Sequence, residues 1–301
     1  MKKAICLLAL ISVFCFVRLA EAQLTQFGKN KVNYESKKIL FYQSEHVDFY
    51  HWQDITDENQ IKYLAHVVDQ VERSYGFLSG YLKHQLKKRP SVVFYRTHSA
   101  FAATHILGNH FIPEGVLAFA LPTGNLGEEY LLAIKLDKPV QEYDATITHE
   151  MAHIFQFDMG PNILQRILRN SGPPNWIMEG GAEFLADEYN SSRFDDFRED
   201  IRRSAGANPE KDLPTWFDLN EESADPYTFG PMALQFIKAK YGQDVVKEFL
   251  IRAFRDGKEL IKILYELTQG GVTSAEQLDE VQRDFWREKF GPEMLSKPRP
   301  Y

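Results

Sequence analysis

A histidine–glutamate motif at residues 149–153 is the strongest candidate for chemistry in this sequence. It reads His149-Glu150-Met151-Ala152-His153, the H-E-x-x-H pattern. On a helix, residues four apart project from the same face, so the imidazoles of His149 and His153 can reach one metal ion. Glu150 lies on the adjacent face, where its carboxylate can act as a general base toward a water on that ion. The spacing therefore predicts a zinc-dependent hydrolytic site.

The sequence around this motif has the pattern of a helix over 144–158. Its apolar residues recur at the spacing of one buried helix face: Ile147, Met151, Ile154 and Phe155. Asp144 or Thr146 could cap the start of the helix, and Gly160-Pro161 is a typical stop signal. A lone H-E-x-x-H match also occurs by chance, as two histidines on an ordinary core helix. A second signal is therefore required.

That second signal lies downstream, in the segment 174–184. Zinc in a hydrolytic site usually has three protein ligands and one position for water. The metzincin pattern is excluded, because Gln156 and Met159 stand where it requires a glycine and a third histidine. Instead, a helix predicted to begin after two prolines carries Glu179 and Glu183 four apart on one face. Taken alone, this segment could also be an ordinary surface helix.

Two glycines, Gly180 and Gly181, follow Glu179 directly. Each costs a helix interior about 1 kcal/mol relative to alanine. Two in succession suggest that the backbone packs closely against a neighbouring element, as expected of a helix that lies next to the H-E-x-x-H helix.

With these residues the chain resembles the gluzincin superfamily of zinc metallopeptidases, which includes thermolysin and aminopeptidase N. The resemblance rests on H-E-x-x-H at 149–153 followed by P-x-W-x-x-E-G-x-A-E-F at 174–184. The likeness is greatest to exported bacterial peptidase-MA-like proteins, many of which continue into a TolB-type β-propeller. It covers about residues 34 to 295, and its specific part is 144–184.

This resemblance implies a zincin-like fold and a set of roles. His149, His153 and Glu179 would ligate zinc, and Glu150 would be the general base. Glu183 would lie behind the ligands and orient a ligand histidine, as carboxylates do around such ions.

A further residue carried over from the resemblance is Tyr227. The segment 225–230 is similar to the Y-x-x-G segment that supplies a transition-state tyrosine in relatives of aminopeptidase N. The resemblance implies that the phenol of Tyr227 donates a hydrogen bond to the oxyanion formed when water attacks a carbonyl. The alternative is that Tyr227 is an aromatic packing residue at a helix start.

A predicted strand before the H-E-x-x-H helix is the candidate for the substrate-binding edge: Gly115, Val116, Leu117, Ala118 and Phe119. Such a strand can pair with an extended peptide. Relatives of aminopeptidase N carry a G-A-M-E-N segment in a comparable place, whose glutamate holds the free amine of the substrate. The absence of a carboxylate from this strand argues against an aminopeptidase and favours an endopeptidase.

Hydrophobic patterning places these segments in a mixed N-terminal half and a helical C-terminal half. Strands are expected at 46–51, 91–96, 115–121 and 131–136, and a helix at 57–85. The remaining segments with helical spacing are 144–158, 175–189, 227–241, 244–255, 258–268 and 274–290. A small sheet followed by helices predicts an α+β fold. We expect one zincin-like domain over 23–301, with a mixed part at about 34–158 and a helical part at about 159–295.

The first 22 residues have the features of a secretory signal peptide. A positive start, Lys2 and Lys3, precedes the apolar stretch Ala4–Val17 and the small-x-small site Ala20-Glu21-Ala22. We expect cleavage after Ala22 and a mature chain that is exported, periplasmic or secreted, without a transmembrane span. The alternative is an uncleaved N-terminal anchor.

Composition limits the partners of the mature chain. The 301 residues are 44% hydrophobic and 26% charged, with a net charge of −7 and no Lys/Arg-rich stripe. Nucleic acid is therefore excluded as an expected partner. The chain ends at Tyr301 without a propeller, so we expect either a longer parent chain or a separate envelope protein, such as a β-propeller, as a partner.

The sequence thus favours a zinc-dependent peptidase of the cell envelope that acts as an endopeptidase on peptides or proteins. A second hypothesis is a non-catalytic binding or assembly module that keeps the zincin scaffold, although a scaffold has no chemical use for Glu150. A third is hydrolysis of an amide that is not a peptide.

Overall fold

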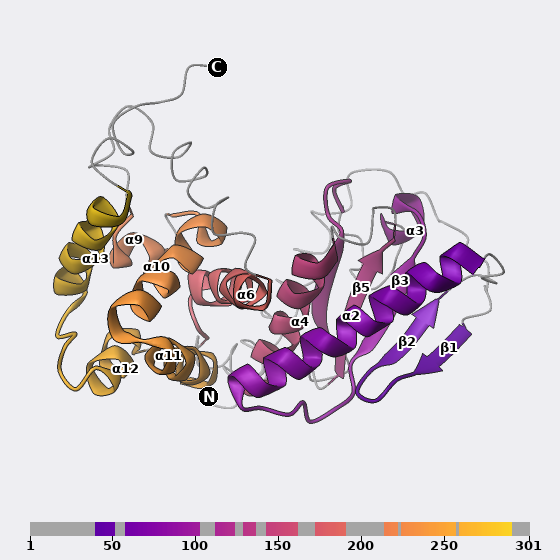
Figure 1. The fold of residues 1–301 in the computed structure, drawn as a ribbon, viewed down its shortest axis with the longest axis horizontal. Helices are drawn as coiled ribbons and strands as arrows, with labels where there is room; N and C mark the ends of the chain where they lie inside the picture. The colour runs from indigo at the N-terminus through magenta and orange to yellow at the C-terminus, as the bar shows by residue number, and fades with distance from the viewer. Residues whose placement is uncertain are drawn as a thin grey trace, which may run out of the picture.

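The computed structural model describes residues 40–51, 58–102, 112–123, 129–136, 143–161, 172–190, 214–221, 224–256 and 259–290. The expected signal peptide at 1–22 lies outside these ranges. The described residues form an α+β structure, with a small mixed sheet in the N-terminal half and helices in the C-terminal half (Figure 1). This agrees with the fold class expected from the sequence.

The sheet has five strands in the order β1-β2-β3-β5-β4. The strands are β1 (Leu40–Gln43), β2 (Asp48–His51), β3 (Ser91–Tyr95), β4 (Ala118–Thr123) and β5 (Glu129–Lys135). The central pairs β2–β3 and β3–β5 are parallel, whereas β1 and β4 pair antiparallel at the two edges. Four strands were predicted, and β1 was not, because four residues are too few for a period-two pattern to stand out.

The long helices agree with the predicted segments to within a few residues. They are α2 (Glu58–Leu82), α4 (Tyr143–Met159), α6 (Asn175–Tyr189), α10 (Pro226–Tyr241), α11 (Gln243–Asp256), α12 (Leu260–Leu267) and α13 (Ala275–Phe290). Two short helices, α3 (His98–Ala102) and α9 (Trp216–Asn220), were not predicted. None of the helices in the described ranges combines the length and the low polarity that crossing a bilayer requires.

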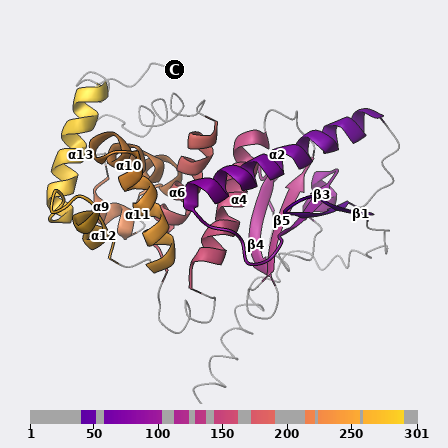
Figure 2. The same cartoon turned by 60° about the horizontal axis from the view of Figure 1, so that its bottom comes forward.

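The core is built on the face of the sheet that α2 and α4 cover (Figures 1 and 2). Along β3, Val92 and Phe94 point into this core, whereas Val93 and Tyr95 join a smaller cluster with Phe101 of α3. The alternation follows from the period of two along a strand. Helix α6 lies between α4 and the helices α9 to α13, so it joins the two halves.

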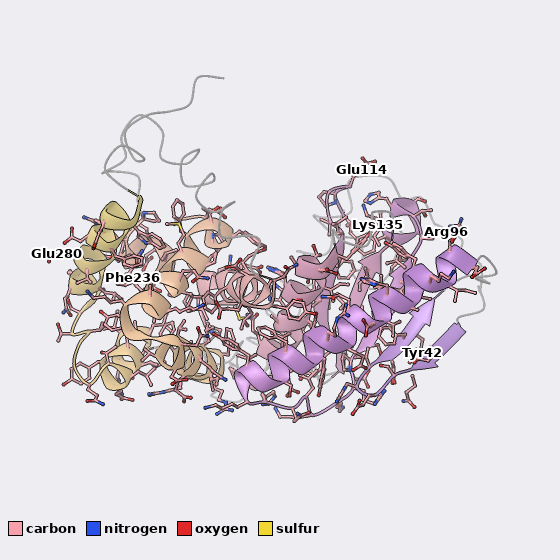
Figure 3. The ribbon with its side chains drawn as sticks, in the orientation of Figure 1. Tyr42, Arg96, Glu114, Lys135, Phe236 and Glu280 are labelled. Carbon is pink, nitrogen blue, oxygen red and sulfur yellow. The ribbon has the colours of Figure 1, made fainter. Side chains whose placement is uncertain are left out.

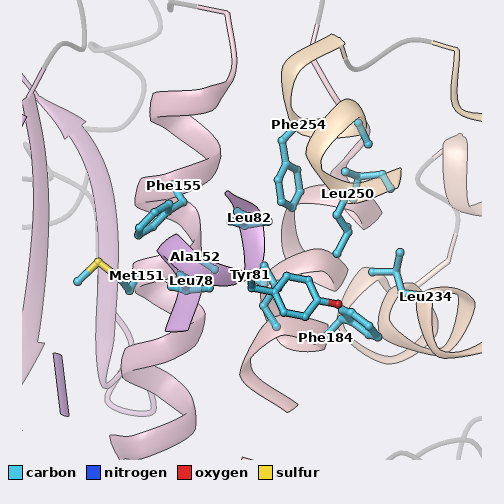
Figure 4. Close-up of a cluster of buried hydrophobic side chains, with 14 of the residues drawn as sticks. Leu78, Tyr81, Leu82, Met151, Ala152, Phe155, Phe184, Leu234, Leu250 and Phe254 are labelled. Atoms are coloured by element: carbon cyan, nitrogen blue, oxygen red, sulfur yellow. The ribbon is translucent and has the colours of Figure 1, made fainter. Parts of the chain in front are cut away.

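The junction between the halves is continuous apolar packing. Side chains from α2, α4, α6, α10 and α11 converge there, and Figure 4 labels ten of them: Leu78, Tyr81, Leu82, Met151, Ala152, Phe155, Phe184, Leu234, Leu250 and Phe254. All but Tyr81 are completely buried. Because interiors of this kind are close-packed, α4 and α6 are held in a fixed relation to each other.

Buried polar contacts also fix both ends of α4. Near its start, the Tyr143 hydroxyl donates to the carbonyl oxygen of Lys135 at 2.5 Å. Near its end, the fully buried carboxylate of Asp158 lies 2.6 Å from Nε2 of His84 and accepts a hydrogen bond from the Tyr130 hydroxyl at 2.7 Å. These contacts join α4 to the sheet and to the segment that follows α2.

The predicted caps of α4 are partly wrong. The helix begins at Tyr143, so Asp144 lies in its first turn and neither Asp144 nor Thr146 is the cap residue. In the first turn, the carboxylate of Asp144 still interacts favourably with the helix dipole. The predicted stop is confirmed, because the helix ends at Met159 and the backbone N–H of Gly160 closes onto the carbonyl of Gln156 at 3.0 Å.

The predicted edge strand begins three residues later than expected. Ala118 and Phe119 belong to β4, whereas residues 115–117 precede the strand. They are still held to the sheet, because the N–H of Lys135 donates to the carbonyl of Leu117 at 2.8 Å. The buried Lys135 ammonium also donates to the carbonyl of Glu114 at 2.7 Å, and Figure 3 shows both residues at the same end of the sheet.

Candidate metal centre

The two histidines of the H-E-x-x-H motif converge on one point. Both lie on α4 and are buried, with 7% of His149 and 8% of His153 exposed. Their Nε2 atoms are 3.1 Å apart. The opposite side of α4 packs into the core through the predicted apolar residues, all of them buried: Ile147, Met151, Ile154 and Phe155. The helix therefore presents its histidines toward α6.

Helix α6 brings Glu179 to the same point. Its Oε2 atom lies 3.2 Å from Nε2 of His153 and 3.6 Å from Nε2 of His149. Ligands bound to zinc at about 2.0–2.1 Å in a tetrahedral arrangement are separated by about 3.3 Å. The three separations lie around that value, so His149, His153 and Glu179 could hold a metal ion.

The electrostatics of this group also favour a cation. Burial lowers the pKa of His149, but Glu179, Glu183 and Glu150 outweigh burial and raise it to about 10. Burial raises the pKa of Glu179, but its contacts with the two histidines hold that pKa well below its usual range. The carboxylates thus stabilise positive charge among these side chains, which is a property required of a metal site.

Glu183 lies behind His149, where the sequence placed it. Its Oε1 atom is 3.0 Å from Nδ1 of His149, and its side chain is only 13% exposed. A carboxylate at Nδ1 directs the other ring nitrogen, Nε2, toward Glu179 and His153. One turn of α6 therefore supplies both a candidate ligand and the group that orients another.

Glu150 and Tyr227 lie at the open side of the group. The Glu150 carboxylate is half-buried and close enough to affect the pKa of both His149 and Tyr227. The ring of Tyr227 stacks on that of His149, with centroids 6.2 Å apart, and its hydroxyl is hydrogen-bonded to Glu179. Because 49% of Tyr227 is exposed, it is not simply a core packing residue.

The start of α10 fixes the position of Tyr227. Asp225 caps this helix, and its carboxylate accepts hydrogen bonds from the backbone N–H of Tyr227 at 3.2 Å and the Thr228 hydroxyl at 2.6 Å. Burial and the neighbouring Glu179 raise the pKa of Tyr227 above its usual range. The phenol therefore keeps its proton and can donate it in a hydrogen bond.

The glycine pair on α6 packs closely, but Gly180 packs against α10 rather than α4. A Cβ atom on Gly180 would lie 2.6 Å from Cα of Gly230, and one on Gly230 would lie 2.9 Å from the carbonyl oxygen of Trp176. A Cβ atom on Gly181 would meet the ring of Phe254 at 3.1 Å. The backbones of α6 and α10 therefore touch, which brings the first turn of α10, with Tyr227, to the candidate ligands.

The sequence analysis missed one residue of this centre, Gln156. Its side chain is fully buried and contacts Nδ1 of His153 at 2.8 Å. A polar residue three positions after His153, on the buried side of α4, was a detectable signal. It was used only to exclude the metzincin pattern.

Zinc is expected to stabilise the protein through Glu179. At a free zinc concentration 1,000 times the dissociation constant, bound metal adds about 4 kcal/mol to the free energy of unfolding. If Glu179→Gln lowers the affinity 100-fold, the gain falls to about 1.4 kcal/mol at the same concentration. Chemical denaturation with and without zinc measures both values.

Glu188→Gln is the matched control, because Glu188 lies on the same helix but pairs with Lys238. This variant should keep the full zinc-dependent gain. An equal gain in Glu179→Gln and in the control would contradict a ligand role for Glu179.

Neither a protein-family model nor a curated protein matches this chain. The functional argument therefore rests on the geometry of this centre.

Proposed function

We propose that this protein is a zinc peptidase with a zincin-like fold, of the gluzincin type, and that it cleaves peptide bonds within protein or peptide chains. The observation that supports it best is the convergence of His149, His153 and Glu179 on one point, with Glu150 and Tyr227 at its open side. A module that only bound zinc would not require a half-buried carboxylate and a half-exposed phenol beside the ligands.

Each side chain has a role in hydrolysis. When bound by His149, His153 and Glu179, zinc polarises a carbonyl group and lowers the pKa of water. Glu150 accepts the proton of the attacking water and passes it to the leaving amine. The hydroxyl of Tyr227 donates a hydrogen bond to the oxyanion that develops on the carbonyl oxygen.

The substrate is proposed to lie along β4. This strand is at an edge of the described sheet, where it pairs with β5, and α4 packs against it. An extended peptide can add to such an edge through backbone hydrogen bonds. Residues 115–119 carry no carboxylate that could hold a free amino terminus. The proposal is therefore an endopeptidase.

The setting of this activity is proposed from the sequence. The basic start, apolar stretch and small-residue site within residues 1–22 favour export, so the enzyme would act in the periplasm or outside the cell. Its substrates would be proteins or peptides of that compartment. A β-propeller protein of the envelope is the proposed partner.

The proposal is tested by offering a diverse peptide mixture to the chain beginning after Ala22 and identifying the products by mass spectrometry. We expect cuts at internal bonds, lost when a chelator removes the metal and restored when zinc is added. The side chains around the cuts would give the specificity. A folded, zinc-loaded protein that cuts no peptide would contradict the proposal and favour a binding module.

A further inference from the structure

Gln156 connects the second histidine to the helix that carries Glu179. Its side-chain Oε1 atom lies 2.8 Å from Nδ1 of His153. Its Nε2 atom donates a hydrogen bond to the carbonyl oxygen of Met178 at 2.8 Å. Met178 directly precedes Glu179 on α6, so one amide contacts one candidate ligand and the peptide group before another.

The orientation of this amide follows from its partners. A backbone carbonyl can only accept hydrogen bonds, so the amide nitrogen of Gln156 must face Met178. The amide oxygen must then face His153. Because that oxygen can only accept, the hydrogen between the two residues belongs to Nδ1 of His153.

We infer that Gln156 is a positioning residue that holds the hydrogen of His153 on Nδ1 and leaves the Nε2 lone pair directed toward Glu179 and His149. The same side chain fixes the position of Glu179 relative to His153 through Met178. Glu183 has the corresponding place at His149, so each histidine has its own partner for Nδ1. The consequence for metal affinity rests on the zinc site proposed above, whereas the hydrogen-bond geometry does not.

Close packing makes this arrangement rigid. Gln156 is completely buried, and a Cβ atom on Gly181 would lie 3.5 Å from its amide nitrogen. The small residue at 181 thus leaves room for the amide between α4 and α6. A buried amide with both bonds made has no alternative partner among these contacts, so the histidine ring cannot reorient without breaking a bond.

Three variants test the inference. Gln156→Leu removes both hydrogen bonds. Gln156→Glu keeps an acceptor for His153 but cannot donate to Met178. Gln282→Leu is the matched control: Gln282 is buried on α13, and its amide oxygen accepts from Nε1 of Trp216 at 3.1 Å.

The first measurement is the Nδ1–H resonance of His153 by ¹H–¹⁵N NMR, assigned by its loss in His153→Ala. We expect a slowly exchanging signal in the wild-type protein, in Gln156→Glu and in Gln282→Leu, and its loss or rapid exchange in Gln156→Leu. A purely structural role would not change this signal selectively. A wild-type His153 with its hydrogen on Nε2 alone would overturn the inference.

The second measurement is the zinc dissociation constant, by competition with a chelator. Losing such a partner of a ligand histidine typically weakens binding 10–100-fold, so we expect a rise of about that size in Gln156→Leu. Gln156→Glu should also bind more weakly, and Gln282→Leu should remain within about twofold of the wild type. Equal affinity in Gln156→Leu and the wild type would overturn the positioning role.

The two proposals fail in different ways. If the wild-type protein binds no zinc but loses the His153 signal in Gln156→Leu, the proposed function fails and the assigned hydrogen bond stands. If the protein binds zinc and cuts peptides, but Gln156→Leu changes neither the signal nor the affinity, the inference fails alone. If Gln156→Leu does not fold, Gln156→Glu decides: unchanged zinc affinity in that variant would overturn the link to Met178.

Discussion

Replacing Glu150 with glutamine is expected to lower the turnover number for peptide cleavage by about 10²–10⁴-fold, the usual contribution of a general base. The amide cannot accept the proton of the attacking water. The side chain is nearly isosteric and lies outside the group formed by His149, His153 and Glu179, so zinc binding should be retained. Steady-state kinetics on the best-cleaved peptide and metal analysis of the purified variant measure the two properties.

Glu280→Gln is the control for this substitution, because Glu280 is exposed on α13 in the helical half (Figure 3). It should have the activity of the wild-type enzyme. Turnover in Glu150→Gln close to that of the control, with zinc bound, would rule out Glu150 as the general base.

The second large effect is expected at the crossing of α6 and α10. In Gly230→Ala the new methyl group would lie 2.7 Å from Cα of Gly180 and 2.9 Å from the carbonyl oxygen of Trp176. These are backbone atoms, so the helices must separate. Overpacking of this kind costs about 1–3 kcal/mol of stability. Because α10 carries Tyr227, and misplacement by about 1 Å can cost 10²-fold in rate, we expect activity to fall by about that factor.

Two comparison variants separate the causes. Gly76→Ala lies in α2, where a Cβ atom meets nothing within 4 Å, so it should raise stability by roughly 0.5–1 kcal/mol and leave activity unchanged. Tyr227→Phe removes only the hydroxyl and should lower the turnover number by about 10²–10³-fold without the loss of stability. Denaturation and kinetics measure both. A Gly230→Ala protein as stable and as active as the wild type would disprove the close crossing.

Local signals explain what was predicted well. The long helices follow from apolar residues at helical spacing and from stop signals such as Gly160-Pro161, which act within a few residues of chain. The relation of His149 to His153, and of Glu179 to Glu183, follows from the helix repeat alone. These pairs could therefore be placed on common faces without knowledge of the tertiary structure.

Short elements and exact boundaries were less predictable. The strand β1 and the helices α3 and α9 have four or five residues each, too few for periodicity to be distinctive. Helix α9 did have a local signal, because Thr215 and Asp218 form a capping box. The late start of β4 depends on its pairing with β5, which no local pattern in residues 115–119 reports.

The sequence by itself determined the types of residue at the candidate centre and the helices that carry them. Only the tertiary structure decided which helices meet. The contact of Gly180 with Gly230 brings Tyr227 over His149, and the space between α4 and α6 places Gln156 between His153 and Met178. Such contacts depend on how whole helices pack, because side-chain volumes and backbone approach distances set the crossing of two helices. That information is distributed over the core and is not contained in any one motif.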